Sequence, residues 1–171
     1  GESPRLRPQP DVSEAPFEPV FGFEETAADY VFDVPTSRNF VEKLVSRPFR
    51  ERAFSSAVKS AYLDTCAVTG IKIINGGGRS EVQAAHIRPV AADGPDSIRN
   101  GLALSGTMHW MFDRGLISIS DDLKLLVAEG KVPESVARLF PQDGRLRLPT
   151  RIDSRPHPGF LKFHRDTVFK G

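Results

Sequence analysis

The feature that most constrains the fold is the order of short structural signals between positions 81 and 115. A strand signal over Glu81–Ile87 is followed by a loop that contains glycine and proline, and a second short strand is predicted over Gly101–Leu104. Ser105 is a suitable N-cap for the helix that follows, and Gly115 stands where a helix C-terminus favours a left-handed residue. This strand–loop–strand–helix order predicts an α+β unit in which the helix packs across a hairpin.

Further signals surround this unit. Apolar residues at helical spacing within Arg50–Leu63 predict an amphipathic helix. In the central helix, the apolar side chains from Met108 to Phe112, Trp110 included, are expected in the core. Four more elements are expected: a short helix capped at Asn39 and running to about Ser46, a strand over Ile71–Ile74, a hairpin of Leu116–Ser120 and Leu123–Val127, and a short helix that starts at Pro133.

Charge is distributed unevenly along the 171 residues. Residues 1–46 are rich in proline and hold 4 Lys/Arg and 9 Asp/Glu, which predicts an acidic linker and docking segment at the tail of an upstream domain. Residues 47–171 hold 19 Lys/Arg and 13 Asp/Glu, and their tail after Gly144 is expected to be irregular and basic. A basic body behind an acidic leader favours a polyanionic partner, with a mixed solvated surface as the alternative.

Cysteine content and hydropathy restrict the location of the protein. The single cysteine, Cys66, excludes an intramolecular disulfide and a zinc site made only of cysteines from this chain. No apolar run approaches the length of a membrane span, and no signal-peptide pattern is present. The sequence therefore predicts a protein of the reducing cytoplasm that makes no contact with a membrane. Because the chain begins with Gly-Glu-Ser, we expect more protein upstream.

Three polar residues of the 81–115 unit are suited to catalysis. His86, Asn100 and His109 are expected at a strand end, in a loop and on a helix, and packing of the helix across the hairpin would bring both histidines into one groove. A neutral histidine can take a proton from water. His109 and Asp113 are four residues apart, so they share a helix face and can together hold one divalent ion. For each residue alone, an ordinary packing or surface role is the alternative.

The segments Ala84–Pro89, Asn100–Leu104 and His109–Gly115 resemble the HNH endonuclease family, and most closely its branch of bacterial restriction endonucleases. Cys66–Gly70 fits the same pattern, and the resemblance covers roughly residues 47–171. It implies a ββα-metal core with flanking helices and an additional β-hairpin. It further implies that His86 is the general base and that an Asn100 side chain bonded to the loop backbone holds the histidine ring.

One departure from the family concerns structural zinc. Many HNH proteins bind zinc through two CxxC pairs, and the corresponding positions here hold Cys66, Thr69, Ser105 and Met108. Three of the four ligands are missing, so we expect no structural zinc.

A second departure concerns the catalytic metal. Many family members place a metal-binding acid or histidine directly before the general base, and this position is Ala85. The ligands are therefore expected to be His109 and Asp113, with Gln83 as a further candidate. A single divalent ion is expected, with Mg²⁺ favoured and Mn²⁺, Ni²⁺ or Zn²⁺ as alternatives.

Together these features predict a metal-dependent HNH endonuclease that hydrolyses DNA. The resemblance implies the nuclease part of a bacterial restriction or defence enzyme, with a recognition domain upstream and a homodimer as an open alternative. Arg88, Arg114, His164 and Arg165 are predicted to contact nucleic acid. The main competing hypothesis, favoured by Ala85, is a catalytically degenerate HNH fold that binds nucleic acid or a protein partner. A nuclease of structured RNA or a toxin is a third.

Overall fold

A computed structural model describes the backbone of residues 40–171 and the side chains from Pro48 onward. These residues lie within one unit, which spans Pro35–Gly171. Most of the predicted acidic segment 1–46 and the predicted cap at Asn39 lie outside the described residues. Within residues 40–171, no helix combines the length and the apolar character that crossing a bilayer requires.

Helix α1 spans Phe40–Ala61 and continues through Pro48. The sequence predicts two helices in this region, and the structure corrects them to one. A proline removes a single backbone donor from a helix interior. Beyond it, Phe54 and Val58 are buried one turn apart, and this core packing sustains the helix across the proline. The predicted domain boundary between residues 46 and 47 falls inside α1.

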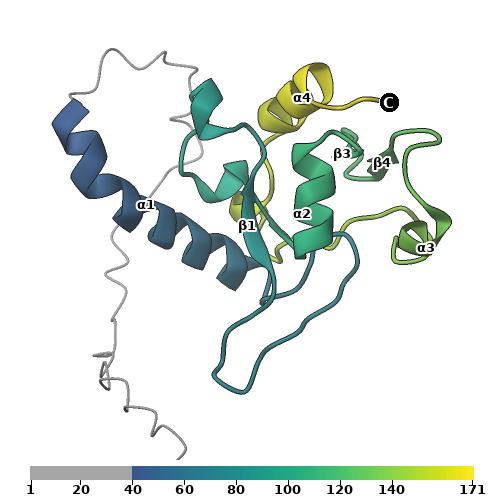
Figure 1. Cartoon of the computed structure of the whole chain (residues 1–171), viewed down its shortest axis with the longest axis horizontal. Helices are drawn as coiled ribbons and strands as arrows, with labels where there is room; N and C mark the ends of the chain where they lie inside the picture. Colours follow the sequence, from purple (N-terminus) through teal and green to yellow (C-terminus); the bar gives the residue numbers. More distant parts are fainter. Residues whose placement is uncertain (1–39) are drawn as a thin grey trace, which may run out of the picture. The chain divides into compact units, whose positions relative to one another are not determined.

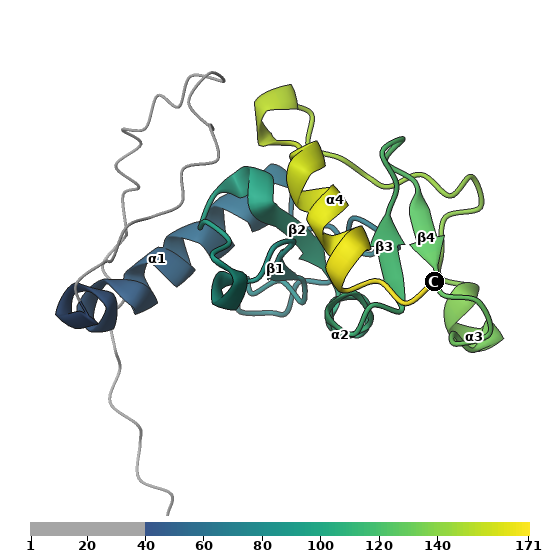
Figure 2. The ribbon, with the colours of Figure 1, turned by 90° about the horizontal axis from the view of Figure 1, so that it is seen from above.

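The predicted strand–loop–strand–helix unit is confirmed. Strand β1 (Gln83–His86) pairs antiparallel with β2 (Gly101–Leu104), and His86 lies opposite Gly101 in the register. Helix α2 spans Gly106–Asp113. Helices α1 and α2 lie on opposite sides of this hairpin (Figures 1 and 2), and both contact its strands.

The two ends of α2 are stabilised in different ways. Ser105 is the N-cap residue, but the backbone N–H of Gly106 donates to a carboxylate oxygen of Glu81 at 2.9 Å, and no hydrogen bond comes from the Ser105 side chain. Gly115 follows the helix with φ +71°, as predicted. A Cβ at this position would also lie 2.0 Å from a backbone oxygen near the C-terminus, so only glycine fits. Trp110 is exposed, contrary to expectation.

A second hairpin and two helices complete the described part of the chain. Strands β3 (Ile117–Ile119) and β4 (Leu125–Val127) pair antiparallel, which confirms the predicted hairpin, and α3 (Glu134–Ala137) follows Pro133. Helix α4 (Pro158–Thr167) packs against β3 within a tail that was expected to be irregular. Its residues Phe160, Leu161 and His164 are buried, so an apolar face drives this helix despite the basic composition around it.

The first predicted strand, over positions 71–74, is wrong. Within the described chain, Ile74 and Ser80 form only an isolated bridge. The side chains of Ile71 and Ile73 are exposed, so no packing supports a longer pairing.

The four positions at which related proteins carry CxxC pairs are held by packing and hydrogen bonds. Cys66 and Met108 are fully buried, and the Cys66 thiol donates to Ser105 Oγ at 3.7 Å. Thr69 Oγ1 accepts a hydrogen bond from a nearby backbone N–H. This contact joins two of the four positions directly, and the expected lack of structural zinc stays a prediction.

Candidate active site

The loop between β1 and β2 is organised by one buried side chain. Asn100 ends the 3-10 helix η2 (Ile98–Asn100) and is fully buried. Its Oδ1 accepts from the Arg88 backbone N–H at 2.8 Å, while its Nδ2 donates to the carbonyls of Arg88 at 3.0 Å and Pro95 at 2.9 Å. The side chain therefore spans the loop and fixes both of its arms. The 3-10 helix η1 (Val90–Ala92) lies within the same loop.

His86 stands at the end of β1 with its ring held on two sides. The ring of Phe54, from α1, stacks on it with centroids 3.8 Å apart and an interplanar angle of 14°. His86 Nε2 lies 3.0 Å from Asp96 Oδ1, which belongs to the loop. The side chain keeps about 20% of its surface accessible, so water can reach the ring.

His109 is oriented by a neighbour on β1. Its Nδ1 lies 2.7 Å from Gln83 Oε1, and since an amide oxygen can only accept, Nδ1 carries the hydrogen. Nε2 is then the nitrogen with a free lone pair. It lies 3.4 Å from Asp113 Oδ2, one helical turn further along α2. An outer partner that fixes the ring in this way is characteristic of histidines that ligate metals.

His86, His109 and Asp113 line one cavity of about 310 Å³. The three side chains come from β1 and α2, so the fold brings together the predicted general base and both predicted metal ligands. Asn100 is buried beside this cavity in the loop and is not part of its wall. Ala85, the residue before His86, is fully buried in the core.

The donor set fits a divalent ion that shares its coordination with substrate. An imidazole Nε2 and a carboxylate oxygen meet on one helix face, and within residues 48–171 no group of three or more His, Cys, Asp or Glu is arranged to hold a metal. Two protein ligands leave positions for phosphate oxygens and water, as is usual for Mg²⁺ at phosphate-processing sites.

The two residues near the C-terminus that were predicted to contact nucleic acid are bonded within the protein. His164 is only 2% exposed, and its nitrogens bond to Ser118 Oγ at 2.8 Å and to the Phe112 carbonyl at 3.0 Å. Arg165 donates to the Ile119 carbonyl at 2.8 Å and pairs with Asp121. Both side chains fasten α4 to the second hairpin, and His164 also lines the cavity of His86 and His109. Their contact with nucleic acid stays a prediction.

The other two predicted contacts differ from one another. Arg88 Nε donates to the Ala92 carbonyl at 2.6 Å, and the guanidinium lies 5.0 Å from the centre of the Phe163 ring. These contacts tie Arg88 to the loop and to α4. Arg114, which follows Asp113 at the end of α2, is exposed and stays a candidate for phosphate binding.

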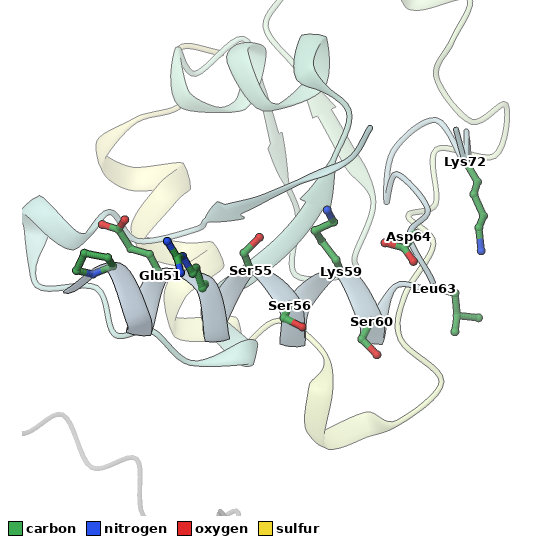
Figure 3. A pocket seen from close by; sticks show the side chains of 10 residues that line it. Glu51, Ser55, Ser56, Lys59, Ser60, Leu63, Asp64 and Lys72 are labelled. Carbon is green, nitrogen blue, oxygen red and sulfur yellow. The ribbon is translucent and has the colours of Figure 1, made fainter. Parts of the chain in front are cut away.

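A larger and shallower groove of about 860 Å³ runs along the outer side of α1 (Figure 3). Small hydroxyl side chains and cations line it, among them Arg52, Ser55, Ser56 and Lys59 of the helix and Lys72 of the following segment. Glu51 and Asp64 add acidic groups. The groove shares no lining residue with the cavity of His86 and His109.

Sequence reasoning missed two contacts of the candidate base. Asp96 lies among the turn residues of Asp93-Gly-Pro-Asp96, where an aspartate is common for local reasons. Phe54 is identifiable as a core residue of the first helix, but nothing in the sequence pairs it with His86. Both contacts depend on how the loop and α1 meet in three dimensions.

A hairpin that carries a histidine at the end of its first strand, crossed by a helix that carries a second histidine and a carboxylate, defines the ββα-metal class of nuclease folds. Residues 66–120 match the family described as HNH endonuclease. The solved structure described as a modification dependent TagI restriction endonuclease is similar, with a TM-score of 0.51 and 29% sequence identity. No curated protein matches this chain. Residues 66–120 therefore resemble an HNH endonuclease domain, and the fold around them is similar to that of a restriction endonuclease.

The extent of the structural match limits what it says about this chain. It covers 68% of this chain and 37% of the TagI chain, so the present chain corresponds to little more than a third of that protein. The match shows the nuclease fold.

Proposed function

We propose that the chain is the metal-dependent nuclease part of an enzyme that hydrolyses DNA phosphodiester bonds. The observation that carries this proposal is the shared cavity, in which His86 of β1 faces the same space as His109 and Asp113 of α2. A proton acceptor and a pair of metal-binding donors that line the same cavity suit a phosphate group bound there.

In this proposal, His86 accepts a proton from a water molecule that attacks phosphorus. A new P–O bond forms to the water oxygen, and the bond to the departing sugar oxygen breaks. His109 and Asp113 would hold the divalent ion, which when bound supplies Lewis-acid neutralisation of charge on the phosphate. Asn100 contributes indirectly, because its bonds to Arg88 and Pro95 keep the loop in place.

We assign contacts to the DNA backbone to cationic side chains that form no ion pair with another described residue. Arg114 lies next to Asp113 at the end of α2. Arg52, Lys59 and Lys72 of the α1 groove form no ion pair with another described side chain. Since α1 also carries the Phe54 ring under His86, this groove is rigidly connected to the candidate active site. Binding through such contacts should weaken steeply with salt.

The biological setting we propose is bacterial restriction or defence. The similar TagI protein is described as modification dependent, and the present chain corresponds to 37% of it. We therefore assign target recognition to a part of the protein upstream of the nuclease domain, which residues 1–46 would link as an acidic, proline-rich segment. A cytoplasmic location follows from this setting.

The first prediction tests the chemistry. His86→Ala should lower plasmid cleavage by at least about 100-fold in Mg²⁺ or Mn²⁺, because general-base catalysis contributes roughly 10²- to 10⁴-fold. DNA binding, measured by fluorescence anisotropy, should be unchanged. Arg138→Ala serves as the control, since Arg138 is exposed and pairs only with Glu134 on α3. Cleavage by His86→Ala at the wild-type rate would contradict the assignment.

The alternative function, a binding module, is favoured by one observation. Ala85 is buried and leaves only two protein ligands for a metal in the cavity. If the wild-type chain binds DNA but leaves it intact with Mg²⁺, Mn²⁺, Ni²⁺, Co²⁺ and Zn²⁺, the binding module is the better description. Parallel digestion of RNA separates a ribonuclease from both.

A further inference from the structure

The contact between His86 and Asp96 has chemical consequences of its own. Their side chains keep only about 20% and 26% of their surfaces exposed, so the ring nitrogen and the carboxylate meet in a partly desolvated place. The Nε2–Oδ1 distance of 3.0 Å is that of a hydrogen bond. The Phe54 ring stacks on one face of the imidazole, so a tilt of the ring would break the stacking and a flip would break the contact with Asp96.

The position of Asp96 is fixed by the buried asparagine. Asn100 Nδ2 donates to the carbonyl of Pro95, which forms the peptide bond to Asp96. Behind it, Ser97 Oγ accepts from the backbone N–H of Arg99 at 3.3 Å. The backbone at Asp96 is therefore fixed on both sides. Asn100, which joins the two arms of the loop, also positions the Asp96 carboxylate next to His86.

The hydrogen-bond chemistry determines which ring nitrogen is protonated. An ionised carboxylate can only accept, so in the neutral ring Nε2 carries the hydrogen and Nδ1 keeps its lone pair. Asp96 has no other partner among the described residues. The proton acceptor of His86 is thereby set to Nδ1.

We infer that Asp96 is the positioning residue of the candidate base, which selects the Nε2–H tautomer of His86 and leaves Nδ1 to receive the proton of water. This inference rests on the proposed function for its catalytic meaning. Asn100 then supports catalysis by holding the backbone from which Asp96 reaches the ring. When His86 becomes protonated, the Asp96 carboxylate also stabilises the imidazolium.

The tautomer can be read directly by ¹⁵N NMR of protein labelled at its four histidines, with His86 signals assigned by their loss in His86→Ala. In the wild type at neutral pH, we expect shifts of a protonated Nε2 and an unprotonated Nδ1. In Asp96→Ala, the two ring nitrogens should move toward averaged values as the tautomers mix. Asp153→Ala is the matched control, because Asp153 is exposed and pairs with Arg151, not with a histidine.

Kinetics provide the second readout. Asp96→Ala should lower kcat about 10- to 100-fold, as loss of an outer partner of a catalytic histidine usually does, with KM changed by less than about 2-fold. Asp96→Glu should recover part of kcat, since it restores a carboxylate acceptor. Unchanged His86 shifts in Asp96→Ala, or wild-type kcat in that variant, would overturn the inference.

The two readouts separate this inference from the proposed function. If the wild-type chain cuts no nucleic acid but the His86 tautomer changes in Asp96→Ala, the nuclease proposal fails and the positioning role of Asp96 holds. If the wild type cuts DNA and Asp96→Ala cuts it equally fast, the nuclease proposal holds and the role of Asp96 fails.

Discussion

At the scale of single residues, His164 and His86 show how surroundings decide the use of a histidine. His164 lies in the core, stacked on Phe112 with ring centroids 3.7 Å apart. Burial lowers the pKa of His164 to about 4, although its bond to the Phe112 carbonyl acts in the opposite direction. It is therefore neutral at pH 7 and stabilises the packing of α4. His86, by contrast, keeps an accessible edge and a carboxylate partner.

The lowered pKa of His164 predicts a pH dependence of stability. The unfolded chain binds a proton at His164 below about pH 6.5, whereas the folded chain binds it only near pH 4. The stabilisation by neutral His164 is thus complete above pH 6.5 and is lost as the pH falls toward 4. The size of this loss is on the order of 2–3 kcal/mol.

Urea denaturation at pH 7 and pH 4.5 measures this dependence against His164→Gln, which cannot titrate. The wild type should lose more free energy of unfolding between the two pH values than the variant does. Other ionisable groups are common to both proteins and cancel in the comparison. Equal losses would show that His164 does not titrate as its surroundings require.

At the scale of elements, the position of His86 depends on how closely α1 approaches β2. A Cβ placed on Gly101 would lie 2.3 Å from Val58 Cγ2 and 3.1 Å from the Phe54 ring. Glycine at this position therefore lets the helix reach the hairpin, and the same approach presses Phe54 against His86. Of the neighbouring residues Asn100 and Gly101, the first holds the loop together and the second allows α1 to approach the hairpin.

Gly101→Ala should lower the free energy of unfolding by about 1–3 kcal/mol, because overpacking displaces α1. Thermal and urea denaturation measure the loss. Gly76→Ala is the control, since an added Cβ there meets nothing within 4 Å. The double variant Gly101→Ala/Val58→Ala should lose less free energy of unfolding than the sum of the losses in the two single variants. Additive losses would mean that the two positions are not in contact.

The elements also show what the sequence could predict and what it could not. The hairpin, α2 and the second hairpin follow from turn residues and apolar spacing close together in the chain. The strand at positions 71–74 has the right composition but no packed partner, so it fails. Helix α4 was missed because charged residues are interspersed with its apolar ones in a basic tail, although Pro158 in its first turn and the pair Phe160 and Leu161 were readable signals.

At the scale of the whole molecule, long-range contacts decide which polar residues face a ligand. The motif was sufficient to predict that His86, His109 and Asp113 belong together, and they line one cavity. The motif did not predict that Arg88 and Arg165 are engaged within the protein, because their partners, Phe163 and Asp121, lie far away in sequence. For the same reason Asp96 was not found, since its importance comes from the ring that it meets.

The contact between Cys66 and Ser105 has a consequence for how the protein depends on metal supply. The two residues are joined by a thiol–hydroxyl contact, Met108 is buried, and we predict that the fold needs no structural ion. If so, excess EDTA should abolish cleavage while the melting temperature, followed by circular dichroism, changes by less than about 2 °C, because a structural ion would otherwise contribute folding free energy. A large drop in melting temperature would reveal a structural ion. With an unchanged melting temperature, chelation would inhibit the proposed nuclease reversibly, and cells short of divalent metal would hold a folded, inactive pool ready for rapid activation.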